Sequence, residues 1–234
     1  MKGKLQYGGT IIPYHVIQTK RKKTIQIFIE KDRVEVRAPK SKDISEIKQL
    51  LKNRSRWIFI SQLKLKERKT DITVSKNSLL YLGKNVPYTV KSLEKTNEID
   101  LKKNSFQICI KSKSITERKI TQVYHDWLLE KYSPYVKKKI DYFSKILNVK
   151  PEGFQIRNLK SKWGSATVSG NIHLNLHLLK TPRKMIDYVI LHELVHLKIK
   201  GHKHEFWAYL EKFMSDYEIR KVWLEKNHVE ILRS

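Results

Sequence analysis

The stretch TPRKMIDYVILHELVHLKIKGHKHEFW, residues 181–207, decides how the rest of the chain is interpreted. It contains the pattern H-E-x-x-H, formed by His192, Glu193 and His196. Two histidines four residues apart project from the same face of a helix, so both imidazoles can bind one metal ion. Glu193 directly follows the first histidine. Its carboxylate is therefore expected beside the metal, where it can take a proton from bound water without being a ligand.

The residues around this pattern predict that it lies on a helix. Thr181 followed by Pro182 is typical of an N-cap and a first helical position, and Gly201 is typical of a left-handed C-terminal cap. We therefore predict a helix from about residue 182 to residue 200, with both histidines in its C-terminal half. Its apolar residues recur at helical spacing and include Met185, Ile186, Val189, Ile190 and Leu197.

Two more histidines, His202 and His204, follow the expected end of this helix, and either offers a third ligand. His202 lies six residues beyond His196, a spacing similar to that of the three-histidine zincins. In those proteins a glycine usually stands where this chain has Ile199. A pair of structural histidines on a buried helix is the alternative, but the combined signals favour a metal site. We predict Zn²⁺ bound by His192, His196 and His202, with one position left open for water.

Together with upstream residues, this stretch resembles the YgjP-like metallopeptidase family, which is related to the SprT-like and WLM zincins. Residues 157–165 include K-S-K-W-G-S and are similar to that family's R-x-x-K-S-R-W-G-S-C pattern. Residues 201–207 are similar to its N-H-S-x-x-F-W pattern, which aligns His202 with the third ligand. The chain departs from the family at Ala166, where cysteine is usual, and no expected zinc ligand is lost there.

The resemblance implies a zinc-dependent metallopeptidase that hydrolyses peptide bonds in a protein or peptide substrate, with Glu193 as the general base. It also implies that extended substrate pairs with a sheet edge in the hairpin of residues 154–178. Arg157, His173 and His204 are candidates for stabilising the oxyanion, and His204 could instead lie behind the ligands or face the substrate.

Three alternatives remain open at this point. Members of the family are sometimes assigned nucleoside triphosphate pyrophosphatase activity, which would keep the metal and change the substrate. By analogy with SprT-like and WLM relatives, the protein could be a peptidase that DNA recruits to DNA-bound proteins. A nucleic-acid-binding module with a purely structural metal is disfavoured by Glu193, because a closed structural site needs a fourth protein ligand and no base.

The charge is strongly unbalanced, with 49 Lys plus Arg against 23 Asp plus Glu and a formal net charge of +26. Such an excess favours polyanions such as nucleic acid, although dispersed lysines can serve solubility alone. No apolar run approaches the roughly 18 residues of a membrane span, and no signal-peptide pattern opens the chain. Cys109 is the single cysteine, so no intramolecular disulfide is possible. We expect a cytoplasmic protein without a membrane partner.

The apolar patterns predict an α+β fold in two parts. Residues 1–112 are expected to form a mostly β region with one helix over residues 43–65, strands within residues 10–39, and a second β segment over residues 72–110. Residues 113–234 are expected to form a zincin-like metallopeptidase domain, with an antiparallel hairpin before the metal-binding helix. We expect helices broken at Pro134, and a hairpin over residues 154–178 in which His173, Asn175 and His177 lie on the face opposite the leucines. His173 and His177 are expected to face solvent, with lining of a cleft as the alternative. Cys109 is expected to be half-buried and His228 to lie at the surface.

Overall fold

The computed structural model describes residues 1–20, 24–30, 32–66, 72, 75–93, 96–112 and 114–234. The remaining residues lie outside the described part and include pieces of both predicted β segments of the N-terminal region and residue 113, next to the expected boundary. The chain divides into two compact units, Met1–Thr70 and Asp71–Ser234.

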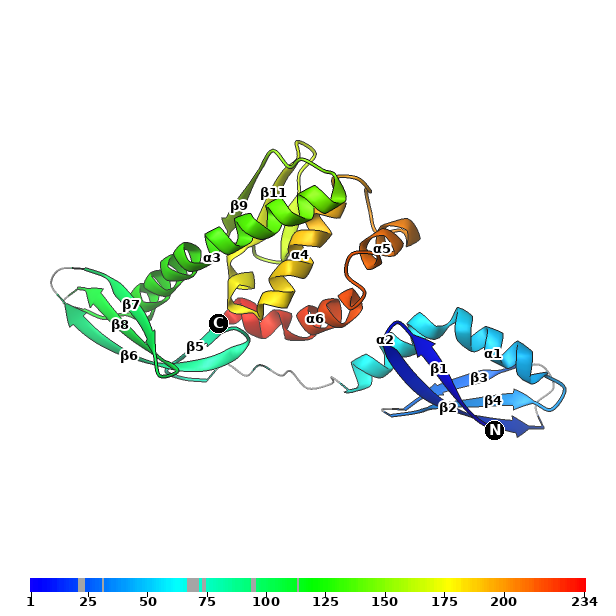
Figure 1. Cartoon of the computed structure of the whole chain (residues 1–234). Coiled ribbons are helices and arrows are strands. Elements are labelled where there is room, and N and C mark those ends of the chain that lie inside the picture. Colours follow the sequence, from blue (N-terminus) through cyan, green and yellow to red (C-terminus); the bar gives the residue numbers. More distant parts are fainter. Residues whose placement is uncertain (21–23, 31, 67–71, 73–74, 94–95, 113) are drawn as a thin grey trace. The chain divides into compact units, whose positions relative to one another are not determined.

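The first unit is a four-stranded sheet with two helices on one face (Figure 1). Its elements are β1 (Lys2–Tyr7), β2 (Thr10–Thr19), β3 (Gln26–Ile29), β4 (Val34–Pro39), α1 (Ile44–Asn53) and α2 (Ser55–Lys66). The sheet order is β1-β2-β4-β3, with β2 and β4 parallel and the other pairs antiparallel. The single predicted helix is thus two helices separated at Arg54. Ile47, Leu51 and Ile58 bury their side chains against the sheet.

The second unit opens with another four-stranded sheet, in the order β5-β6-β8-β7. Its strands are β5 (Ser78–Tyr81), β6 (Lys84–Leu93), β7 (Glu98–Lys102) and β8 (Ser105–Lys111). The predicted hairpin is present, and Leu82 and Gly83 turn between β5 and β6 with positive φ of 52° and 79°. Cys109 is half-buried on β8, as predicted.

This sheet is joined to the elements that follow it, so the compact unit begins at residue 71 and not near the expected boundary at residue 112. The Gly83 N–H donates to the carbonyl of Lys180 at 2.8 Å, and a Cβ on Gly83 would lie 2.9 Å from the ring of Pro182. Tyr124 donates from its hydroxyl to the carbonyl of Leu80. A turn of the sheet therefore contacts the start of the predicted metal-binding helix directly.

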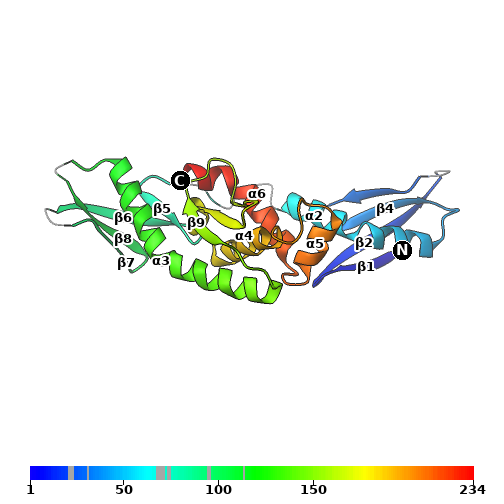
Figure 2. The ribbon, with the colours of Figure 1, turned by 90° about the horizontal axis from the view of Figure 1, so that it is seen from above.

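A long helix, α3 (Glu117–Leu147), packs against this sheet and along α4 (Arg183–Val195), as Figures 1 and 2 show. The predicted break at Pro134 is wrong, because the helix continues through it. Ser133 donates from its hydroxyl to the carbonyl of Leu129, one turn earlier. Ten residues along the helix are buried, and this packing holds it continuous despite the hydrogen bond that proline cannot make.

A three-stranded sheet packs against α4, in the order β10-β11-β9. Its strands are β9 (Gly153–Arg157), β10 (Gly164–Ala166) and β11 (Asn171–Asn175); β10 and β11 form the antiparallel hairpin, whereas β9 pairs with β11 in parallel. The predicted strand does not reach residue 178, because Leu176–Lys180 forms a 3-10 helix, η1. The side chain of Asn175 caps η1 by accepting from the His177 N–H at 3.1 Å.

Three helices complete the unit: α4, α5 (His204–Glu211) and α6 (Tyr217–Arg233). The predicted helix of residues 182–200 is shorter at both ends, since α4 begins at Arg183 and ends at Val195. Thr181 does not cap it and instead donates to the carbonyl of Leu178 at 2.7 Å. Gly201 has the predicted positive φ, 76°, but in the turn after the helix. Within the described residues, none of the helices is long and apolar enough to span a membrane.

Candidate metal centre

Three histidines converge where α4 ends and the chain turns toward α5. His192 lies in the last turn of α4, His196 is its C-cap residue, and His202 lies in the turn that follows. The Nε2 atom of His202 is 3.0 Å from that of His192 and 3.1 Å from that of His196. Among the described residues, these three form the group of His, Cys, Asp or Glu side chains that could hold one metal ion.

The imidazoles are kept in the neutral form that binds metals. Burial lowers the pKa of all three, and for His192, the most buried, the pKa falls to about 3. The neighbouring histidines and Lys221 lower the pKa of His192 further, because each positive charge disfavours another. At neutral pH each ring therefore has one protonated nitrogen and one nitrogen whose lone pair can bind a metal ion.

The donor atoms fit a shared cation. His196 Nδ1 lies 3.2 Å from the carbonyl oxygen of Ile199, which can only accept, so Nδ1 carries the proton and Nε2 is left as an acceptor. This is the outer contact that metal-binding histidines usually make, and it fixes the tautomer. The indole of Trp207 donates to the His202 carbonyl at 2.9 Å and stacks on the His202 ring. These contacts hold the Nε2 atoms of His196 and His202 toward one point.

Glu193 is buried beside the triad. Burial raises the pKa of its carboxyl to about 7, although a hydrogen bond from the backbone of Ala166 and the charge of Lys162 act in the opposite direction. A carboxyl with a pKa near neutrality can both accept and return a proton at physiological pH.

Gly164 allows the edge strand β10 to approach this carboxylate. A Cβ at Gly164 would lie 2.9 Å from Cγ and Oε1 of Glu193 and 3.0 Å from a methyl group of Val189. The glycine is required by this close approach, and its φ is not in the left-handed region. The W-G-S pattern of residues 163–165 is the sequence signal that could have identified this role of Gly164.

Asn175 anchors the segment that leads into β10. The sequence placed Asn175 on the same face as His173 and His177, and the structure shows that it is fully buried. Its amide donates to the carbonyls of Leu159 and Lys162 at 2.8 and 2.7 Å, and its own N–H donates to the Trp163 carbonyl at 2.8 Å. The alternation of the strand ends where η1 begins, so position in the strand does not indicate this burial. Asn175 therefore positions the loop that carries Gly164 to Glu193.

A cavity of about 490 Å³ opens beside Glu193, between α4, α6 and the segment before β10. His228, predicted at the surface, is half-buried in its lining and meets Trp163 edge-on with ring centroids 5.1 Å apart. The lining contains both Glu193 and His192, so the cavity adjoins the triad. Its other main members are Trp163, Tyr188, Glu225, His228 and Val229.

The remaining predicted site residues lie outside this constellation. His204 is exposed at the first position of α5 and does not belong to the triad. Arg157 is exposed at the end of β9, and His173 is half-buried on β11; neither lines the cavity. His177 does not face solvent, since its Nδ1 lies 3.1 Å from the Ile231 carbonyl in a buried contact.

The strand next to Glu193 is a sheet edge. In the order β10-β11-β9, β10 and β9 are the outer strands and β11, which directly precedes η1 and α4, is central. The edge beside the candidate base is therefore β10, the first strand of the hairpin. It offers backbone groups for pairing with an extended chain.

Comparisons with known proteins identify the family of the chain. No curated protein matches the chain. The crystal structure of the metallopeptidase zymogen of Pyrococcus abyssi abylysin is similar at 26% identity over 39% of this chain and 93% of that chain, with a TM-score of 0.35. The model of the YgjP-like metallopeptidase domain matches residues 23–227, nearly the whole sequence. The chain belongs to the YgjP-like metallopeptidase family.

Proposed function

We propose that the protein is a zinc-dependent peptidase in which His192, His196 and His202 hold the metal and Glu193 is the general base. The observation that supports this most directly is the convergence of three histidines beside a buried carboxyl, with the Nε2 atoms of His192 and His196 3.0 and 3.1 Å from that of His202. Three neutral imidazoles with one position left open are a donor set suited to catalytic zinc. When bound, the metal would polarise the scissile carbonyl and make a nearby water more acidic.

The protein's own groups carry the proton. The Glu193 carboxylate removes a proton from the attacking water and later delivers it to the nitrogen of the departing amine. Its burial favours both steps, because a pKa of about 7 lies near physiological pH. The Ala166 backbone and Lys162 favour the ionised form and so keep the group available as a base.

The surroundings of Glu193 suit an extended polypeptide. We infer that substrate pairs with the edge of β10 and places one side chain in the cavity of about 490 Å³. Trp163, Tyr188 and Val229 give that cavity apolar walls. Backbone pairing provides affinity independent of sequence, whereas the cavity selects the side chain next to the scissile bond.

The ligand assignment is tested by metal content. We expect about one zinc per wild-type chain by elemental analysis, because one triad holds one ion. His192→Ala and His202→Ala should lose the zinc, and His204→Ala, the matched control in the same turn region, should retain it. Zinc retained by His202→Ala and lost from His204→Ala would overturn the assignment of the third ligand.

The reaction class is tested by comparing substrates. Wild-type protein should cleave an unfolded protein such as reduced casein, and Glu193→Gln should not. Nucleoside triphosphates, incubated in parallel, separate the peptidase from the pyrophosphatase alternative. Release of pyrophosphate without any peptide cleavage would contradict the proposal.

A further inference from the structure

The cavity beside the metal centre contains a second carboxylate that the proposed mechanism does not use. Among its described lining residues, Glu193 and Glu225 carry carboxyl groups. Glu193, the proposed base, is buried, whereas the Glu225 side chain is 52% exposed. The two groups therefore lie in different surroundings of one cavity, and Glu225 is accessible to a charged group that enters from solvent.

Helix α6 forms the wall of the cavity that faces the β10 side. Glu225, His228 and Val229 stand three and four positions apart on this helix, so their side chains share one face. The segment before β10 contributes Trp163 to the lining, and α4 contributes Tyr188 between the two walls. A substrate strand paired with β10 would begin at one wall, and a long side chain from it can reach Glu225 at the other.

The charge of Glu225 acts inside the cavity. Burial of Tyr188, and after it the negative charge of Glu225, raise the pKa of the Tyr188 hydroxyl. Tyr188 is nearly buried and lines the same cavity. The carboxylate of Glu225 therefore makes the aromatic part of the cavity electronegative, and not only the solvent around α6.

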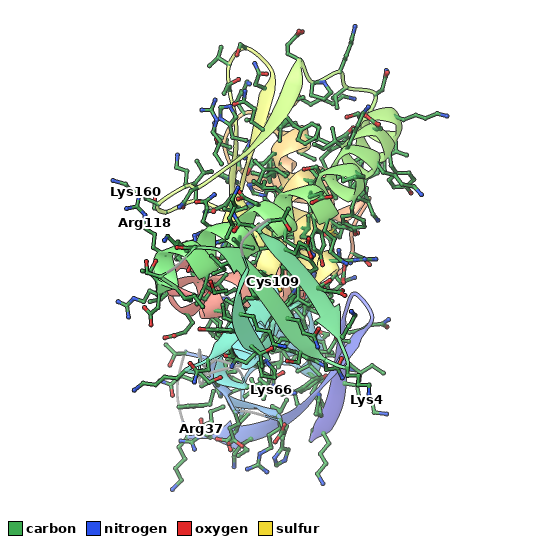
Figure 3. All side chains as sticks on the ribbon, turned by 90° about the vertical axis from the view of Figure 1, so that its left-hand side faces the viewer. Lys4, Arg37, Lys66, Cys109, Arg118 and Lys160 are labelled. Carbon is green, nitrogen blue, oxygen red and sulfur yellow. The ribbon has the colours of Figure 1, made fainter. Side chains whose placement is uncertain are left out.

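The basic residues before β10 do not cancel this charge. Lys162 lines the cavity and is exposed, and its charge favours the ionised form of Glu193. Lys160, labelled in Figure 3, is exposed on the same loop and is not a lining residue. Positive charge from this loop is therefore directed to the base, at the wall opposite α6.

The cation nearest to Glu225 on its own helix is held weakly. Lys221 Nζ lies 3.8 Å from Glu225 Oε1, and both side chains are largely exposed. The same ammonium group lies 4.3 Å from the centroid of the Trp207 ring. An exposed pair at this distance contributes little, and a carboxylate can accept from more than one donor. Glu225 therefore retains capacity for a second cation.

A long basic side chain complements this arrangement. Lysine and arginine combine an apolar stem with a charged head that stays partly in water. Trp163 and Tyr188 offer ring surfaces to the stem, and an indole also attracts a cation. An acidic side chain would meet two carboxylates. The net charge of +26 opposes a basic substrate only weakly at close range, because charges beyond about 8 Å are largely screened at physiological salt.

We propose that Glu225 makes this cavity a subsite for lysine or arginine at the substrate residue next to the scissile bond. The stem lies against Trp163 and Tyr188, and the charged head reaches the Glu225 carboxylate on α6. The inference rests on the proposed peptidase function and adds to it the class of side chain that the cavity selects.

The test begins with the full-length protein supplied with zinc. It digests reduced casein, and mass spectrometry maps the cleaved bonds. One cleaved peptide is then synthesised with lysine, norleucine or glutamate at each residue that flanks the scissile bond. Norleucine keeps the stem of lysine without the ammonium group. At one flanking position kcat/KM should be about five- to tenfold higher for lysine than for norleucine, between the effect of an exposed ion pair and that of a charge-assisted hydrogen bond.

Variants of α6 test whether Glu225 causes the preference. Glu225→Gln should bring the lysine and norleucine peptides within about twofold of each other, and Glu225→Lys should favour glutamate over lysine. Glu230→Gln is the matched control, because it removes the same charge from the same helix outside the cavity lining. It should keep the wild-type ratio. Zinc content and circular dichroism should be the same in all three variants.

Binding gives a readout that does not need turnover. In the Glu193→Gln background, fluorescence anisotropy should show tighter binding of the labelled lysine peptide than of the norleucine peptide, and Glu225→Gln should abolish the difference. A lysine preference that survives Glu225→Gln, or a wild-type preference for norleucine, would overturn this inference and leave the peptidase proposal standing. Cleavage of no protein or peptide would overturn the peptidase proposal, and equal binding of the two peptides would then overturn the subsite as well.

Discussion

At the scale of single residues, the candidate site depends on a carboxyl that is buried and yet close to a backbone strand. Glu193 is 6% exposed, and Gly164 leaves room for its side chain where any other residue would place a Cβ 2.9 Å away. Asn175 holds the approach to that strand through two amide hydrogen bonds. Activity should therefore be sensitive to residues that contact neither metal nor substrate.

Replacing Glu193 by glutamine tests its role as base. The amide has the same shape and cannot take a proton, so the variant should keep its zinc content and fold and lose about 10²–10⁴-fold in peptide hydrolysis. Circular dichroism and elemental analysis serve as controls for fold and metal. Wild-type turnover by Glu193→Gln would exclude this residue as the base.

Replacing Gly164 by alanine tests whether the close approach of β10 to the Glu193 side chain is needed. The added Cβ would meet Cγ and Oε1 of Glu193, and the carboxylate must move or the strand must retreat. We expect the variant to bind zinc normally and to lose roughly 10²-fold in kcat, because small misplacements of a catalytic group are costly. Gly153→Ala, in which the Cβ would meet only the Asn171 side chain at 3.2 Å, is the matched control. Equal activity of both variants would argue against the close contact.

The three histidines could be predicted to lie together because their spacing along the chain is short. His192 and His196 share a helix face by spacing alone, and His202 follows after a turn glycine. Gly164 and Asn175 could not be predicted in the same way. Their roles arise from Glu193 and from the carbonyls of Leu159 and Lys162, which other elements bring to them.

At the scale of elements, the helices and strands were largely predictable and their ends were not. The hairpin over β5 and β6 follows from the apolar alternation and Gly83, and the N-terminal strands follow from β-branched residues. Pro134 was expected to break α3, but packing along the whole helix keeps it continuous. The strand before α4 ends early because the Asn175 side chain caps η1 in place of continued pairing. Such local competition is decided by tertiary contacts.

The contact between η1, α3 and α6 gives the second unit a sensitivity to acid. His177 of η1 and His125 of α3 lie with ring centroids 5.6 Å apart, and Lys180 Nζ is 3.3 Å from His177 Nδ1. Burial, and then the charge of Lys180, lower the pKa of both histidines to about 4. The unfolded chain, with an ordinary histidine pKa near 6.5, binds these protons more readily.

Above pH 6.5 both histidines are neutral in the folded and in the unfolded chain, so they do not lower the free energy of unfolding. As the pH falls from 6.5 toward 4, the unfolded chain binds protons that the folded chain does not, and the free energy of unfolding should decrease. His177→Asn keeps a donor for the Ile231 carbonyl and cannot be protonated, so its unfolding free energy should fall less between pH 6.5 and 4. Urea unfolding of metal-free protein across this range measures the slope. His173→Asn is a histidine variant outside the cluster and should retain the wild-type slope. A His177→Asn slope equal to wild type would contradict this account.

At the scale of the whole molecule, each unit has its own main hydrophobic core among the described residues, and a small cluster of Ile72, Leu80 and Ile231 adds to that of the second unit. The sequence suggested a boundary near residue 112, because a β-rich segment ends there and helical segments follow. The structure places the second sheet in the second unit, where the turn at Gly83 contacts Lys180 and Pro182. Gly83 and Lys180 are about a hundred positions apart in the sequence, and no local sequence pattern predicts their contact.

This division predicts how metal removal acts on the protein. All three proposed ligands lie in the second unit, so zinc should stabilise that unit and leave the first unchanged. At a free metal concentration about 100 times Kd, linkage gives about 2.7 kcal/mol. For a unit of this size the Tm should rise on the order of 5–10 °C.

Hydrogen exchange with mass spectrometry resolves the two units within the intact chain. On chelation, peptides from residues 71–234 should lose protection, and peptides from residues 1–66 should keep it, because binding energy stabilises only what folds with the ligand site. His192→Ala should respond to neither zinc nor chelator. Equal loss of protection in both units would mean that they unfold as one cooperative body. No loss of protection in either unit would contradict metal binding by the three histidines.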